Sequence, residues 1–185
     1  MKKLLLAFFA FIAFAATSCI ENEDIVFKGE LVEMDAATWN ANTTGKDYPV
    51  LTRVPAPGRN VYTATTNGFP ADPLITRSTG KIKLRVNLVG AQQSVDQVIS
   101  YGIVPNETFV SGTIAADAAV KGTHYNTGST FTIPANSSFG FIEIDVINPG
   151  TALAKDQLIV IELIGNDKFK PSANEKRVGL VINKG

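Results

Sequence analysis

Few side chains in this 185-residue chain have the types and spacing that catalysis needs. His124 is the only histidine, which excludes metal sites with several histidine ligands and leaves one residue for any Ser-His-Asp arrangement. Because it stands beside Tyr125 in the turn-like segment GTHYN, we expect a structural histidine. Glu143 and Asp145 share one face of a strand, at about the 5–10 Å separation of glycosidase carboxylates. Acids that alternate along a strand usually form its solvated face, so we expect no catalytic residues and no enzyme.

Phosphate-binding loops are also missing from the sequence, because no glycine cluster follows a strand and opens a helix. We therefore expect no cofactor. The remaining candidates are the aromatic residues Trp39, Tyr48, Tyr62 and Phe69, which all fall between residues 34 and 80. Aromatic rings make good platforms for sugar rings or partner proteins. The alternative is that they pack this segment against the rest of the domain as a small satellite cluster.

The N-terminus has the layout of a secretory signal peptide, with Lys2 and Lys3 before a continuous apolar run over residues 4–16. An uncleaved anchor helix is the alternative, but a span needs about 20 apolar residues and this run is shorter. Ala16-Thr17-Ser18-Cys19 resembles the relaxed lipobox of Bacteroidota lipoproteins. The resemblance implies that residues 1–18 are removed and that Cys19, the only cysteine, carries the lipid anchor.

Acids follow Cys19 directly, in a segment that we assign, over residues 19–24, to a tether. Glu21, Glu23 and Asp24 resemble the signal that exports Bacteroidota lipoproteins to the outer face of the outer membrane, and a plain solvated linker is the alternative. Without residues 1–18 the 17 basic residues fall to 15 against 17 acidic ones, a net charge near −2. This charge offers no footprint for nucleic acid.

Alternating apolar residues predict strands in the second half of the chain. Lys81–Leu88 and Phe141–Ile147 each have one apolar and one polar face, whereas Leu158–Ile164 is apolar on nearly every residue, as in a strand covered on both sides. The segments LRVNLVG and LIVIELIG end alike, which suggests similar positions in facing sheets. Short strands separated by turns every 8–12 residues indicate an all-β sandwich.

We expect a single domain over residues 25–185. Within it, residues 34–80 are polar and rich in turn formers, and they form either an extended arm or an extra hairpin. In the hairpin, residues 51–54 would pair with 60–66 across a Pro57-Gly58 turn.

The segment GTHYNTGSTFTIPANSSFGFIEIDV, residues 122–146, followed by QLIVIELIGND, resembles Calx-β-type immunoglobulin-like domains. It is more similar still to a poorly characterised group of Bacteroidota surface lipoproteins built on that sandwich. The resemblance covers residues 80–183 and implies an antiparallel sandwich of about seven to nine strands. Calcium-binding members have clustered acids in their loops, but this chain has scattered Asp117, Asp156 and Asp167, so we expect no metal site.

These observations together predict a lipid-anchored, non-catalytic protein on the surface of the outer membrane. The lipoprotein resemblance implies an accessory binding component of a nutrient-uptake system that holds a glycan or docks on an outer-membrane transporter complex. The alternative is a structural or adhesion module that contacts other surface proteins through sheet edges or through residues 34–80.

Overall fold

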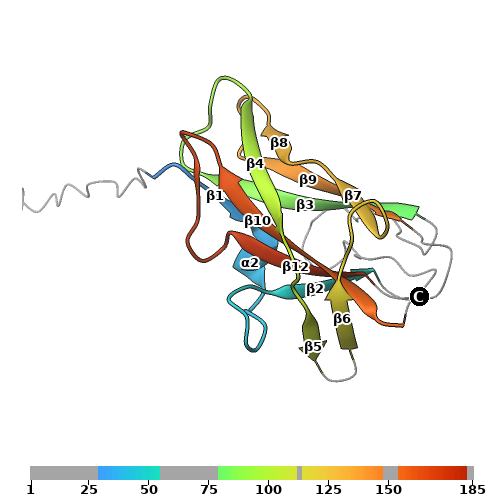
Figure 1. Ribbon diagram of the computed structural model, residues 1–185. Coiled ribbons are helices and arrows are strands. Elements are labelled where there is room, and N and C mark those ends of the chain that lie inside the picture. Colours follow the sequence, from blue (N-terminus) through green and yellow to red (C-terminus); the bar gives the residue numbers. More distant parts are fainter. Residues whose placement is uncertain (1–28, 55–78, 112–113, 148–153, 183–185) are drawn as a thin grey trace, which may run out of the picture.

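Strands make up most of the computed structural model, which describes residues 29–54, 79–111, 114–147 and 154–182 (Figure 1). Within these ranges there are twelve strands and one short helix, arranged as two facing sheets. The first sheet has five strands in the order β11-β1-β3-β9-β7. Their bounds are β11 Lys170–Pro171, β1 Leu31–Met34, β3 Thr79–Val89, β9 Phe139–Ile147 and β7 Tyr125–Thr127.

The second sheet follows the path β2-β12-β10-β4-β8, and the hairpin of β5 and β6 extends it through a pairing of β6 with β10. Figure 1 shows this hairpin projecting from the body of the sandwich. The bounds are β2 Val50–Val54, β12 Arg177–Ile182, β10 Asp156–Gly165, β4 Gln97–Val104, β8 Thr130–Ile133, β5 Phe109–Ser111 and β6 Ile114–Ala118.

The main core lies between the two sheets. It takes the alternate apolar residues of β3 and β9, so the predicted inner and outer faces of these strands are confirmed. Strand β10 is buried on both faces, also as predicted: Ile159 and Ile161 join the main core. Leu158 and Val160 join a second cluster that includes Tyr48 and residues of β5, β6 and β12. Strands β3 and β10 each lie in the middle of a five-strand path, which matches the prediction of similar positions in facing sheets.

The predicted all-β sandwich is confirmed, with two differences in detail. The described residues form twelve strands, more than the seven to nine expected. Three pairings are parallel, β1 with β11, β6 with β10 and β2 with β12, where antiparallel pairing was expected. Both differences have one cause: the extra and parallel strands span only two to five residues in most cases, too few to show a clear alternation.

The segment after β1 contains the short helix α2, Asp35–Trp39, and a loop that leads to β2. Strand β2 confirms that residues 51–54 are extended, and its described partner is β12 in parallel register. The predicted hairpin partner, residues 60–66, lies outside the described residues.

Candidate functional site

Several predicted site residues lie outside the described part of the chain. These are Cys19, Glu21, Glu23, Asp24, Tyr62 and Phe69. Their assignments to the lipid anchor, the export signal and an aromatic platform stay predictions.

The other two predicted platform residues have opposite surroundings. Trp39 ends α2 with 68% of its surface exposed, whereas Tyr48 is only 2% exposed and belongs to the second core cluster. The Tyr48 hydroxyl donates to Glu107 Oε2 at 2.9 Å, and burial is the main reason that its pKa rises to about 12. Tyr48 therefore packs the loop onto the sheet, as the alternative interpretation of these aromatics expects, and Trp39 is the one that faces solvent.

His124 lies in the turn before β7, with its side chain bound to the turn itself. The ring Nδ1 accepts a hydrogen bond from the Val120 backbone N–H at 2.9 Å, and the His124 backbone N–H donates to the Val120 carbonyl at 2.8 Å. Burial lowers the His124 pKa, which favours the neutral ring that this acceptor role requires. The position is that of a structural histidine.

Glu143 and Asp145 point outward from β9 and contact the lysines of β3. Glu143 lies 2.7 Å from Lys81 Nζ and 3.0 Å from Lys83 Nζ, and Asp145 lies 3.7 Å from Lys81 Nζ. The hydrogen bond from Lys81, followed by the one from Lys83, lowers the pKa of Glu143. An acid catalyst needs a raised pKa, so the lowered pKa of Glu143 favours a carboxylate that is ionised at neutral pH.

These acids belong to a larger feature that we call the charged-aromatic face, on the outer side of β3 and β9. It consists of Lys81, Lys83 and Arg85 from β3 with Phe139, Phe141, Glu143 and Asp145 from β9. The strands are antiparallel, and their register places Lys81 opposite Asp145, Lys83 opposite Glu143 and Arg85 opposite Phe141. Because side chains alternate across a strand, all seven lie on the side away from the core.

Two phenylalanines give this face an exposed apolar part. Phe139 and Phe141 are 36% and 38% exposed, and their ring centroids are 5.6 Å apart in an edge-to-face arrangement. The Arg85 guanidinium carbon lies 4.2 Å from the Phe139 ring centroid, and Lys83 Nζ lies 6.0 Å from that of Phe141. Both distances are within the range of cation–π attraction. These phenylalanines were not predicted as site residues, although the same alternation that exposes Glu143 also exposes Phe141.

Hydrogen bonds orient the Arg85 end of the face. Arg85 Nε donates to Asn87 Oδ1 at 3.0 Å, and Asn87 Nδ2 donates to Asp35 Oδ1 at 2.8 Å. Because both ends of the Asn87 amide are engaged, the Asn87 side chain is fixed, and it helps hold the guanidinium over Phe139. Contacts within the protein in this way hold this end of the charged-aromatic face in one arrangement.

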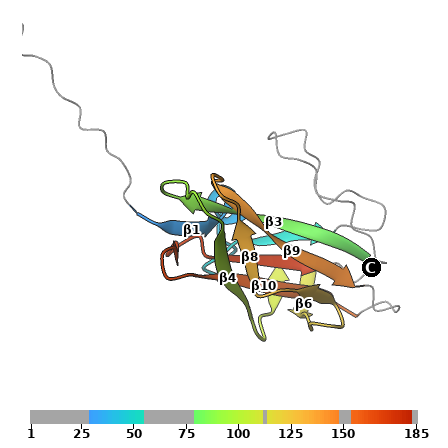
Figure 2. The same cartoon turned by 90° about the horizontal axis from the view of Figure 1, so that it is seen from above.

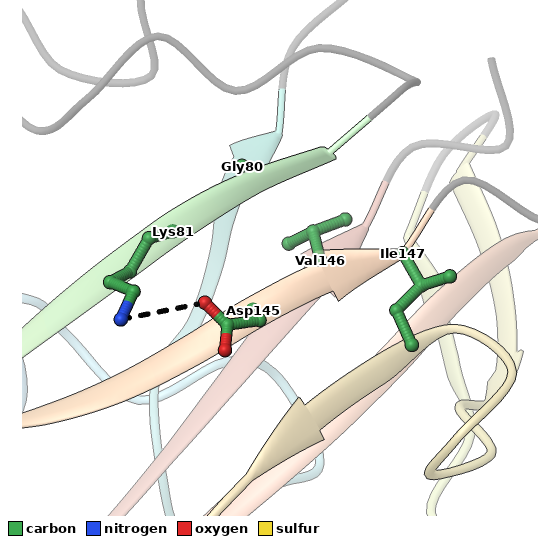
Figure 3. Close-up of a pocket in the computed structure, with 5 residues that line it drawn as sticks. All are labelled: Gly80, Lys81, Asp145, Val146 and Ile147. Atoms are coloured by element: carbon green, nitrogen blue, oxygen red, sulfur yellow. Dashed lines mark ion pairs between the residues drawn. The ribbon is translucent and has the colours of Figure 1, made fainter.

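An open hollow of about 370 Å³ adjoins the other end of this face (Figure 3). It is lined by Gly80, Lys81, Asp145, Val146 and Ile147, and Figure 3 shows the Lys81 ammonium directed at the Asp145 carboxylate. The described residues, those of the hollow included, contain no group of three or more His, Cys, Asp or Glu side chains that could hold a metal ion. None of the helices in the described ranges has the length and apolar character to cross a membrane.

No protein-family model and no curated protein matches this sequence. Among solved structures, a "putative carbohydrate binding protein" from Bacteroides ovatus aligns with a TM-score of 0.42 and 8% identity, over 60% of this chain and 32% of its own. A protein of unknown function from Bacteroides ovatus has a TM-score of 0.41 and 12% identity, over 56% of this chain and 36% of its own. A two-domain protein of unknown function from Bacteroides fragilis has a TM-score of 0.46 and 8% identity, over 84% and 45%. This chain therefore spans less than half the length of each, and similarity at this level carries no functional argument.

Proposed function

We propose that this chain is a non-catalytic binding protein, anchored by lipid at Cys19 to the outer membrane and exposed at the cell surface. In this proposal it is an accessory component of a nutrient-uptake system and holds a glycan on the charged-aromatic face. One observation carries the binding role: two adjacent, exposed phenylalanine rings lie on an open sheet face among fixed charged groups. Exposed aromatic residues of this kind are the usual anchors of binding surfaces.

The strand register supports a suitable orientation for this role. Leu31, at the start of β1, pairs with Val89, at the end of β3. Gly80, which lines the hollow, is nine residues back along β3, or about 31 Å at 3.4 Å per residue. Figure 2 shows β1 at one end of the sandwich and the start of β3 at the other. A tether upstream of β1 would place the hollow at the end of the sandwich that is farther from the membrane. The charged-aromatic face would then extend along β3 from near β1 to the hollow.

Affinity electrophoresis of the full chain in detergent, in gels that contain a polysaccharide, tests this function. The panel comprises dextran, mannan, xyloglucan, polygalacturonate and chitosan. We expect at least one polysaccharide to retard the protein, and Phe141→Ala to weaken that retardation about tenfold, as truncation of an anchoring ring does. Ile164→Ala is the matched control, because Ile164 is 59% exposed on β10 in the opposite sheet. Retardation by none of the five polysaccharides would reject the glycan-binding role.

The second candidate function is a module that contacts other surface proteins. Strand β5 favours it, because Val110 on this strand is 77% exposed and, among the described strands, β5 pairs only with β6. An edge strand with an exposed apolar residue can pair with another chain. If this function holds, Val110→Lys abolishes co-purification of a partner protein from cross-linked cells. The wild-type protein then also binds none of the five polysaccharides.

A further inference from the structure

The charges of the charged-aromatic face restrict the class of ligand that it can take. The three cations of this face are on β3 and its two carboxylates are on the neighbouring strand β9. Each of the two lysines therefore has an acid beside it. From this pattern we infer that the charged-aromatic face takes a neutral, polyhydroxylated glycan chain; the inference rests on the proposed function and narrows its ligand.

Anionic ligands meet a specific obstacle here. The lysines Lys81 and Lys83 both contact Glu143, at 2.7 and 3.0 Å, and Lys81 also lies 3.7 Å from Asp145. A uronate or sulfate group that approaches either lysine must displace Glu143 or accept its repulsion at short range. These ion pairs are on the protein surface but are intramolecular and already formed, so the incoming anion gains little.

Cationic ligands meet the opposite obstacle. The aromatic rings would be their natural sites, but Arg85 lies 4.2 Å from the Phe139 centroid and Lys83 lies 6.0 Å from that of Phe141. A ligand ammonium group placed near either ring would lie close to a protein cation. An amino sugar polymer is therefore disfavoured.

Neutral hydroxyl groups avoid both obstacles. Each hydroxyl is one donor and two acceptors, so it can donate to Glu143 and accept from Lys83 without breaking their ion pair. The C–H faces of a sugar ring are apolar and can pack on the exposed parts of Phe139 and Phe141. Charged groups and apolar rings lie side by side on this face, just as hydroxyl groups and apolar C–H groups lie side by side on a neutral pyranose.

The length of the face indicates a chain and not a single sugar. From Phe139 to Asp145 the β9 backbone covers six residue steps, about 20 Å at 3.4 Å per residue. Phe139 lies at one end of this span, and Asp145, opposite Lys81, lies at the other. One sugar ring cannot reach both ends, but several linked rings can.

The test measures the affinity of the full chain in detergent for dextran, mannan, xyloglucan, polygalacturonate and chitosan at two salt concentrations. We expect binding to at least one of the three neutral polysaccharides. Raising NaCl from about 0.1 to about 1 M shortens the Debye length from about 10 to about 3 Å, and this binding should change less than twofold. Binding confined to polygalacturonate or chitosan, or binding that falls tenfold or more with salt, overturns the inference but leaves the proposed function standing. Binding to none of the five overturns both.

The Glu143→Gln variant gives a second readout that does not depend on loss of binding. It releases Lys81 and Lys83 from their shared carboxylate, so the variant should acquire polygalacturonate binding that salt abolishes. The control is Asp117→Asn, which removes a surface acid paired with Lys155 outside this face. If the wild-type protein already binds polygalacturonate as tightly as Glu143→Gln does, Glu143 does not exclude anions and the inference is wrong.

Discussion

The carboxylate of Glu107 holds the loop before β2 against the turn that follows β4. It lies 2.5 Å from Lys46 Nζ and accepts the Tyr48 hydroxyl at 2.9 Å, although these residues are 61 and 59 positions away in the sequence. Both donors stabilise the charged carboxylate, and the Lys46 hydrogen bond is the main reason that the pKa of Glu107 is lowered. One half-buried side chain thereby fixes a loop that carries little secondary structure.

Glu107→Gln should lower the free energy of unfolding by about 1–2 kcal/mol at pH 7, the range for a partly buried, charge-assisted hydrogen bond. Because the folded-state pKa of Glu107 is below its ordinary value of 4.5, the stabilisation is complete above that value and is lost as the pH falls through the folded pKa. The difference between variant and wild type should therefore shrink as the pH falls below 4.5, so it should be smaller at pH 3 than at pH 7. Urea unfolding at pH 7 and at pH 3 measures it.

Asp167→Asn is the control for this comparison, because Asp167 is an exposed acid in the turn after β10. It should change the free energy of unfolding by less than about 0.5 kcal/mol at either pH. Equal destabilisation of Glu107→Gln at both pH values would show that packing, and not the charge on Glu107, holds the loop.

For single residues, the sequence predicted the features that depend on close neighbours in the chain. Exposure of Glu143 and Asp145 and the structural position of His124 follow from residues within one strand or turn. Burial of Tyr48 does not, because it depends on Glu107 and on the apolar outer side of β10, both far away in the chain. The exposure of Phe141 could have been predicted, because its side chain lies on the same side of β9 as those of Glu143 and Asp145.

The element that organises the molecule is β10, which is buried on both faces and ends at Gly165. This glycine has φ +86°, and a Cβ atom built on it would lie 2.3 Å from the carbonyl oxygen of Phe169. The chain therefore needs glycine there both for the left-handed backbone and for the close approach of the next turn.

Gly165→Ala should destabilise the fold by about 2–3 kcal/mol or more, since left-handed backbone costs about 1–2 kcal/mol and the clash adds to it. Gly122→Ala is the matched comparison: its φ is +83°, but the space around its Cβ position is open within 4 Å. We expect it to cost only the backbone term, about 1 kcal/mol. Urea unfolding of both variants checks this order, and equal losses would contradict the close approach at Gly165.

Long strands were predictable and short ones were not. The eleven residues of β3 and the nine of β9 show enough alternation to assign both faces. The two residues of β11 and three each of β5 and β7 do not, and they form because longer strands offer them an edge. The parallel pairings join segments as far apart as β2 and β12, so they depend on the path of the whole chain.

The whole molecule separates a proposed anchor from a proposed binding surface. The charged-aromatic face lies on the outside of the five-stranded sheet and extends along β3, away from the end where β1 begins. A lipid at Cys19 would keep this face outside the cell without burying it against the membrane. Anchor and face should therefore be separable by mutation.

Cys19→Ala should move the protein from the membrane fraction to the soluble fraction, because two or more acyl chains supply stable anchoring and the variant would have none. Its affinity for a bound polysaccharide should stay within about twofold of wild type, since Cys19 precedes the described sheets. Membrane fractionation followed by immunoblotting measures the first effect. A variant that remains in the membrane fraction would contradict the tether.

The charged-aromatic face is tested most directly as the ligand-binding surface by NMR of the isotope-labelled protein during titration with a polysaccharide that binds it. If the charged-aromatic face is that surface, the chemical-shift changes will concentrate on the amides of β3 and β9, around Arg85 and Phe139–Phe141. Changes that instead concentrate on β10 and β12, or on the β5–β6 hairpin, would contradict it.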